Sequence, residues 1–231
     1  MPNFHEILSD GGPVYAETNL SNIIAEPWNA LSSLAFLVPV VIWLVRIQGN
    51  YRKHAFLTFC LPLLFLGGLG STLYHAFRSS SLLLQLDVLP IVLLTFSVSI
   101  YFWYRILKSW WKIVLAMAPF ILVRLFVYKF VALSGHDLIN LNYFVTGVMI
   151  FLPCVILLIK TKFAGIKDLI LSCILMILAL YFRGADFGNF TLLPMGTHWL
   201  WHVASAAGSG FLGKYLYDLN TKHLESIENK I

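Results

Sequence analysis

AFLTFCLPLLFLGGLGSTLYHAF, residues 55–77, contains no aspartate, glutamate, lysine or arginine. An uncharged run of this length is long enough to cross the roughly 30 Å hydrocarbon core of a bilayer as a helix. The whole chain has the same character, since 59% of its 231 residues are hydrophobic, 12% are charged and the mean hydropathy is +0.79. These values lie outside the range of soluble proteins, and they predict an integral, multi-pass membrane protein.

Charge-poor segments of spanning length recur along the chain at residues 27–45, 55–77, 79–104, 113–133, 139–159, 168–182 and 197–213. We therefore expect an all-α bundle of seven transmembrane helices over residues 27–217, with an acidic N-terminal segment, 1–26, and a C-terminal tail, 218–231. Arg124 and Lys129 fall inside the fourth segment. They could line a headgroup pocket, but a broken helix or a lysine reaching the interface is the interpretation that we favour. The three cysteines, all in predicted spans, are most simply packing residues: Cys60, Cys154 and Cys173.

The lysines and arginines are distributed unevenly between the two sides of this bundle. Twelve of the sixteen follow the first, third, fifth or seventh segment, whereas the opposite loops hold only Arg78 and Arg183. Because short cytoplasmic loops collect positive charge, we expect a non-cytoplasmic N-terminus and a cytoplasmic C-terminus. The net charge of +5 reflects this topology. No basic patch suggests nucleic acid, and no feature predicts an obligate protein partner.

Ionisable and hydroxyl side chains inside these apolar segments mark a candidate functional site, because burying them in lipid is costly. The second segment carries Ser71 and His75 near its outer end, and the third carries Asp87 about two turns from its start. The seventh opens with His198 and His202, whose i,i+4 spacing places them on one helix face. The predicted topology brings all five to the same leaflet, near the non-cytoplasmic surface.

Three neutral imidazoles with an open fourth position are a common arrangement of catalytic zinc, and the three histidines can supply it. Zinc lowers the pKa of a bound water to near 7, and Asp87 could accept its proton and pass it to a leaving group. A hydroxyl beside the metal, that of Ser71, could stabilise an oxyanion. The pattern differs from the HExxH of metalloproteases, because Trp199 follows His198.

Less specific interpretations exist for each of these residues. Histidines four apart also hydrogen-bond across helices, although the addition of His75 and Asp87 on the same side favours a metal site. Ser71 could equally be a packing residue beside Gly67, Gly68 and Gly70. Asp186 could hydrogen-bond a ligand histidine without contacting the metal itself, or it could pair with Arg183.

The motifs GSTLYH, LDVLP and GTHWLWH, in that order, resemble the alkaline ceramidase family of the CREST membrane hydrolases, a superfamily that includes the progestin and adiponectin receptors. The resemblance covers nearly the whole chain. It implies zinc ligands at His75, His198 and His202, a water-activating base at Asp87 and an oxyanion-assisting group at Ser71. The implied substrate is a membrane lipid, ceramide, whose amide is hydrolysed to a sphingoid base and a fatty acid.

The N-terminal stretch YAETNLSNIIAEPWN, residues 15–29, resembles the segment that binds calcium in this family. The resemblance implies calcium bound by the side chains of Glu17, Asn19 and Glu26 and by the carbonyl of Tyr15. The family places an aspartate just before this tyrosine position, where the chain has Val14, and the spacing to Glu26 is shorter. Without the resemblance, both glutamates would be interpreted as solvated charges.

Two alternatives to a ceramide amidase stay open at this point. One is a receptor-like sensor that keeps zinc for a structural purpose, and the other is a zinc hydrolase of a different amide or ester lipid. The acidic N-terminal segment and its EPWN sequence favour the enzyme.

Overall fold

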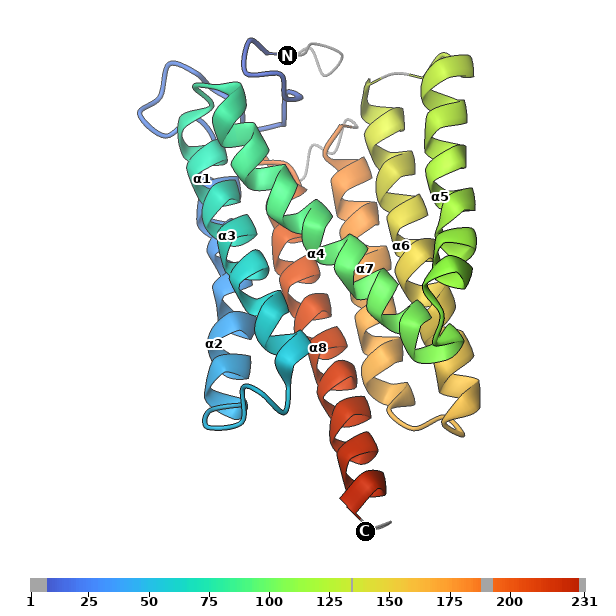
Figure 1. Ribbon diagram of the computed structural model, residues 1–231. Coiled ribbons are helices and arrows are strands. Elements are labelled where there is room, and N and C mark those ends of the chain that lie inside the picture. Colours follow the sequence, from blue (N-terminus) through green and yellow to red (C-terminus); the bar gives the residue numbers. More distant parts are fainter. Residues whose placement is uncertain (1–7, 134, 188–192, 229–231) are drawn as a thin grey trace.

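The computed structural model describes residues 8–133, 135–187 and 193–228, apart from the side chains of 135–136 and 222–228. These residues form helices and connecting loops without a β-sheet, as the sequence predicts. Helix α1 (Pro27–Ser33), a 3-10 turn η1 (Leu34–Phe36) and α2 (Leu37–Arg46) follow one another without a loop. The other helices are α3 (Ala55–Phe77), α4 (Ser81–Leu107), α5 (Trp110–Phe130), α6 (Gly135–Lys160), α7 (Ile166–Ala185) and α8 (His198–Glu228). Figure 1 shows them as a bundle, with the N-terminal segment at one end and the C-terminus of α8 at the other.

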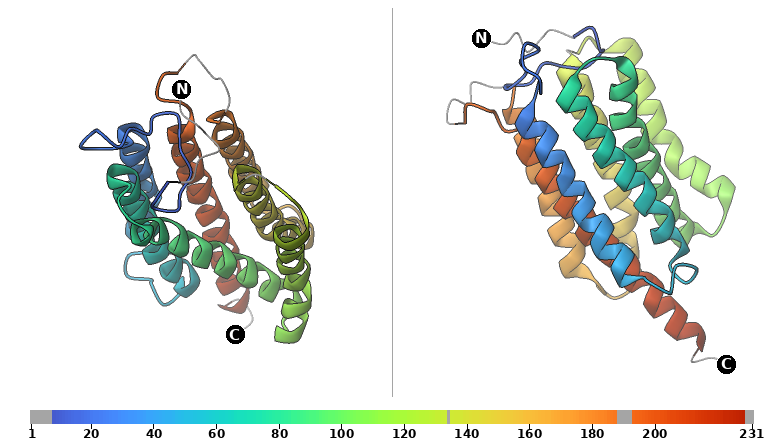
Figure 2. Two further views of the ribbon diagram at one scale, coloured as in Figure 1. Left: turned by 90° about the horizontal axis from the view of Figure 1, so that it is seen from above. Right: turned by 90° about the vertical axis from the view of Figure 1, so that its left-hand side faces the viewer.

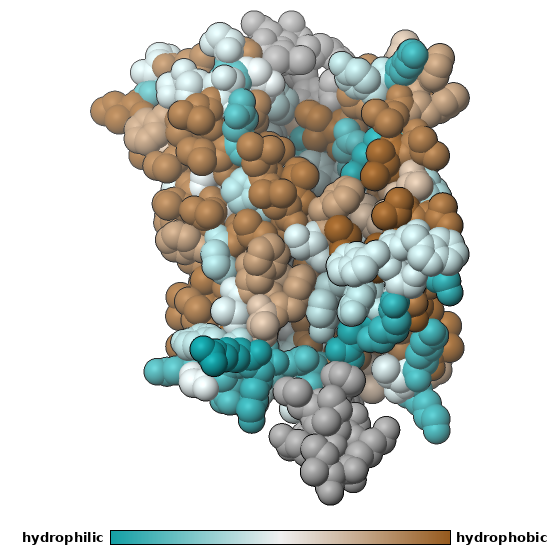
Figure 3. Space-filling model, in the orientation of Figure 1, coloured by the Kyte–Doolittle hydropathy of each residue, from teal (hydrophilic) through white to brown (hydrophobic). Residues whose placement is uncertain are grey.

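Six of these helical segments are long and apolar enough to span a membrane, which confirms the prediction of a multi-pass membrane protein. They are Pro27–Arg46, Ala55–Phe77, Ser81–Leu107, Trp110–Phe130, Asp137–Lys160 and Ile166–Ala185. Large hydrophobic side chains remain exposed along them, above all on α4 and α5. Figure 3 shows these residues as a hydrophobic belt between two more hydrophilic ends. A belt of this kind suits contact with lipid tails.

Close contacts between helices fix the end of the bundle where the histidines lie. A Cβ added at Gly70 of α3 would be 2.1 Å from the backbone oxygen of Leu86 on α4, so only glycine lets the two helices approach this closely. On the other side, α7 and α8 pack along each other, and the Ser172 hydroxyl donates to the Gly208 carbonyl at 2.8 Å. These contacts join α3 to α4 and α7 to α8, and the rings of His75 and His198, 5.3 Å apart, bring the end of α3 to the start of α8.

Several boundaries differ from the sequence-based expectation. The fourth predicted segment stops being helical at Phe130, and α8 continues to Glu228, so residues 218–228 of the expected tail are helical. Arg124 on α5 donates to the Thr146 hydroxyl at 2.5 Å and to a carbonyl of α6, which is a structural role between two helices. Lys129 is exposed at the last turn of α5. All three cysteines are free thiols, with Cys60 and Cys154 buried.

Candidate metal centre

The three histidines singled out in the sequence converge in the structure. His75 lies on the last turn of α3, and His198 and His202 lie on the first two turns of α8. One ligand atom of each lies within 4.8 Å of the others, so the group could hold a metal ion. The three side chains are nearly inaccessible, with exposed fractions of 1%, 3% and 2%. Figure 2 shows that the end of α3 and the start of α8 lie at the same end of the bundle as the N-terminal segment.

Hydrogen bonds orient two of the three rings. Nδ1 of His75 donates to a carboxylate oxygen of Glu26, and Nδ1 of His202 hydrogen-bonds the hydroxyls of Ser32 and Ser33 at 2.9 and 3.2 Å. These bonds leave Nε2 of each ring as the atom available to a metal. Carboxylate and hydroxyl partners on the far nitrogen are typical of metal-bound histidines, because they fix the tautomer and the ring orientation.

His198 is held differently. Its ring stacks on Tyr15, with 4.0 Å between the ring centroids, and its buried Nδ1 has no hydrogen-bond partner in the described part of the chain. A buried polar atom without a partner is costly unless a ligand satisfies it. Three imidazoles, two of them oriented through Nδ1 and one with an unpaired nitrogen, therefore fit a zinc ion, which prefers nitrogen ligands of this kind.

A buried ion-pair network supports the His75 side of the site. The guanidinium of Arg78 donates to Glu26 through Nη1, to Asp10 Oδ2 through Nε at 2.7 Å, and to the Pro13 carbonyl at 2.9 Å. Burial alone would raise the pKa of Glu26, but His75 and Arg78 outweigh burial and hold it below its usual value. Glu26 is therefore a carboxylate that orients His75 and is itself neutralised by Arg78.

Asp87 and Ser71 lie beside the histidines. The buried Ser71 hydroxyl lies 3.0 Å from the Ser33 hydroxyl, within hydrogen-bonding distance, and it lies close enough to the Asp87 carboxylate to interact with it. Asp87 is half-buried on α4 and interacts electrostatically with His75. The structure thus brings together all five residues that the sequence suggested, from α3, α4 and α8. Their chemical roles stay predictions at this stage.

Asp186 bonds His198 through the backbone N–H and not through the ring, and within the described residues it forms no ion pair with Arg183. Its Oδ1 accepts the backbone N–H groups of Thr197 at 2.6 Å and His198 at 2.9 Å, and its Oδ2 accepts that of Ala16 at 3.2 Å. Burial raises the pKa of Asp186, although the three N–H groups oppose this shift. The carboxylate therefore caps α8 and ties it to the N-terminal segment, and it positions His198 through the backbone. Arg183 donates instead to Asn140 on α6 at 2.6 Å.

The four residues expected to bind calcium lie in the loop before α1 and all have partners within the chain. The Tyr15 carbonyl accepts the N–H of Thr18 at 3.1 Å, and Asn19 Oδ1 accepts from Ser21. The Glu17 carboxylate accepts the first N–H groups of α1, from Trp28 at 3.0 Å and Asn29 at 2.6 Å. Glu26 faces His75 and Arg78, as described above. Calcium binding by this loop stays a prediction.

Sequence analysis missed the residues that orient the rings, namely Ser32, Ser33 and the Asp10–Arg78–Glu26 network. One signal was present, because Arg78 is a cation on the side of the bundle where few cations occur. The acidic residues Asp10 and Glu26 of the N-terminal segment explain the position of Arg78, because both form ion pairs with it.

Neither a comparison with protein-family models nor one with curated proteins finds a match to this chain. The function is therefore inferred from the geometry of the site and from the motifs in the sequence.

Proposed function

We propose that this protein is a zinc-dependent membrane amidase that hydrolyses an N-acyl lipid. By the family resemblance, the lipid is ceramide and the products are a sphingoid base and a fatty acid. The observation that carries the proposal is the buried group of three histidines with an aspartate and a serine beside it. In the described residues, no arginine or lysine lies within 4.0 Å of the Asp87 carboxylate. An aspartate that lies beside the proposed metal ligands and forms no ion pair suits proton transfer.

His75, His198 and His202 would hold the metal through ring nitrogens. A bound zinc ion would act as a Lewis acid, which polarises a carbonyl group and lowers the pKa of a bound water to near neutrality. Asp87 accepts a proton from the attacking water and delivers it to the amide nitrogen as the carbon–nitrogen bond breaks and the carbon–oxygen bond forms. The Ser71 hydroxyl, which lies beside Asp87, could donate to the carbonyl oxygen that gains negative charge.

The number of ligands favours an enzyme over a sensor with a structural metal. Structural zinc sites are usually closed by four protein ligands, whereas catalytic sites keep one position open. In the described residues the group holds three members, all histidines. These three ligands are therefore consistent with a site whose fourth position stays open to water and substrate.

We further propose that α8 forms a seventh span through its first part, residues 198–213, which contain no aspartate, glutamate, lysine or arginine. With seven spans, the positive-inside rule makes the N-terminus non-cytoplasmic and the C-terminus cytoplasmic. The histidines would then lie near the non-cytoplasmic leaflet, where an N-acyl lipid can reach them from the membrane.

The test is mass spectrometry of the fatty acid and sphingoid base that the purified protein releases from a panel of ceramides, other N-acyl lipids and ester lipids. Asp87→Ala should lose turnover and keep zinc, whereas His202→Ala should lose both, as elemental analysis of the purified variants would show. Release that Asp87→Ala abolishes would support the amidase. Zinc bound at full occupancy without release from any amide would refute it and favour the sensor or an ester substrate.

A further inference from the structure

A cavity of about 340 Å³ opens at the end of the bundle opposite the histidines. It lies between the start of α3, the end of α4 and the second half of α8, at the lower end in Figure 1. His75 is twenty positions along α3 from Ala55, which lines the cavity, and an α-helix rises about 1.5 Å per residue. The cavity is therefore about 30 Å from the proposed metal centre.

The charged side chains of this cavity are all cationic. Lys53, Arg105 and Lys108 line it, and no aspartate or glutamate does. Within the described side chains, no carboxylate lies within 4.0 Å of any of these three cations. Two acids at the same end of the molecule, Asp168 and Asp218, are paired with Lys214 at 3.0 and 2.7 Å.

The donors of Arg105 are weakly used by the protein itself. Among the described residues, its guanidinium reaches only the Tyr101 hydroxyl at 3.4 Å and the Leu219 carbonyl at 3.5 Å, near the limit for a hydrogen bond. Burial lowers the pKa of Lys108, and the nearby positive charge of Arg105 lowers it further. The cations therefore repel each other, and an anion between them would relieve the repulsion.

Backbone donors add to the positive potential. Helix α3 begins at the cavity, and its N-cap residue His54 makes no side-chain cap to the first turn. The first N–H groups of a helix have no acceptor within it, and together with the helix dipole they attract anions. The C-terminal end of α4 also lies at the cavity, and the negative end of its helix dipole opposes the N–H groups of α3. That end carries about half a unit of charge, which is small beside the three full positive charges of the cations.

Apart from the three cations and the polar residues His54 and Asn220, the wall of the cavity is mainly apolar. Phe56, Leu57 and Leu216 line it beside the ring of Tyr101. Figure 3 shows hydrophilic residues gathered along this lower end, directly below the hydrophobic belt. A cavity with a cationic rim and an apolar wall at the edge of such a belt suits the headgroup of a membrane lipid.

We infer that this cavity binds a phosphate group, which a phosphorylated membrane lipid or a soluble phosphate compound supplies. Arginine and several N–H donors match the oxygens of phosphate better than they match a single-point anion. The site is independent of the metal centre, so binding here is expected whether or not the protein hydrolyses an amide.

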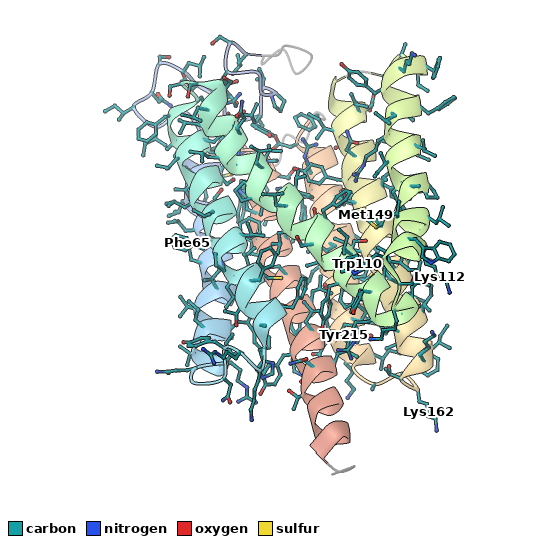
Figure 4. The ribbon with its side chains drawn as sticks, viewed as in Figure 1. Phe65, Trp110, Lys112, Met149, Lys162 and Tyr215 are labelled. Carbon is teal, nitrogen blue, oxygen red and sulfur yellow. The ribbon has the colours of Figure 1, made fainter. Side chains whose placement is uncertain are left out.

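Native mass spectrometry of the purified protein in micelles of a phosphate-free detergent, dodecyl maltoside, would count bound phosphatidylinositol 4-phosphate. Arg105→Gln, Lys53→Gln and Lys108→Gln should each weaken binding about fivefold, because a cation near a phosphorylated lipid contributes about that factor. Lys53 and Lys108 are exposed, so these two variants should fold normally. Lys112→Gln is the matched control, since Lys112 projects from α5 outside the cavity, as Figure 4 shows.

A parallel titration with inositol 1,4-bisphosphate and inorganic phosphate, followed by thermal shift, separates the two sources of phosphate. Tighter binding of the lipid would assign the site to the membrane, and equal binding of the soluble probes would assign it to a soluble phosphate. Both results support the cavity as the phosphate site. Absence of saturable binding of every probe, or an equal loss in Lys112→Gln, would overturn the inference.

Discussion

Replacing Gly70 by alanine should separate catalysis from metal binding. The added Cβ would lie 2.1 Å from the Leu86 oxygen and 2.9 Å from the Asp87 nitrogen, both backbone atoms that no side-chain rotation can move away. Ordinary contact distances would require α4 to shift by more than about 1 Å at Asp87. A misplacement of this size commonly lowers a rate about 100-fold, and overpacking costs about 1–3 kcal/mol of stability. Zinc content should stay unchanged, because the proposed ligands lie on α3 and α8.

The assay combines release of fatty acid, zinc content and melting temperature for Gly70→Ala and a matched control, Gly147→Ala. A Cβ at Gly147 would meet no atom within 4 Å, so the control makes the same chemical change in a helix without a clash. We expect the control to keep full activity. A folded Gly70→Ala protein with normal turnover would show that the position of Asp87 relative to the histidines does not limit the reaction, and the role proposed for this aspartate would fall.

Three further variants or treatments test other parts of the site. Glu26→Gln should weaken zinc binding about 10- to 100-fold in a chelator competition, because His75 loses its anionic partner; unchanged affinity would contradict this role. Arg78→Met should lower the stability by about 3–5 kcal/mol in thermal unfolding, since it leaves Asp10 and Glu26 buried without their cation, and a melting temperature equal to that of the wild type would argue against the network. Removal of calcium with EGTA should lower the melting temperature if residues 15–26 bind it, and an identical melting curve would remove calcium from the proposal.

The sequence predicted helices most accurately where charge and hydropathy change together. Residues 55–77 match α3 at both ends, because charged residues flank an uncharged run. The third predicted segment stopped at Tyr104 before Arg105, yet α4 continues to Leu107. Hydropathy reports where lipid contact ends, whereas a helix can continue beyond it with cations in its last turn. For the same reason the extension of α8 to Glu228 was not foreseen.

The candidate site was predictable as far as spacing and topology determine it. The i,i+4 spacing of His198 and His202 and the antiparallel order of the segments were enough to bring Asp87 and His75 to the same end. The choice of hydrogen-bond partner was not predictable, because it depends on distances between parts of the chain far apart in sequence. Asp186 shows this clearly, since a separation of twelve residues from His198 does not reveal whether its carboxylate meets the ring or the backbone.

The groups that orient the proposed metal ligands belong to a part of the chain that contributes none of these ligands. Glu26 holds His75, while Ser32 and Ser33 hold His202, and Tyr15 covers the ring of His198. The segment before α1 and the end of α1 therefore contact all three rings.

A calcium ion bound by this segment and the proposed zinc ligand His75 would consequently share one carboxylate, that of Glu26. One oxygen of Glu26 faces His75, and the other accepts from Arg78 and from Thr18 at 2.6 Å. A calcium ion coordinated by Glu26 would withdraw negative charge from His75 or displace Arg78, so the two metals would change each other's affinity by the same factor. Zinc titrations with and without calcium would measure that factor, and a ratio of one would mean that calcium does not reach Glu26.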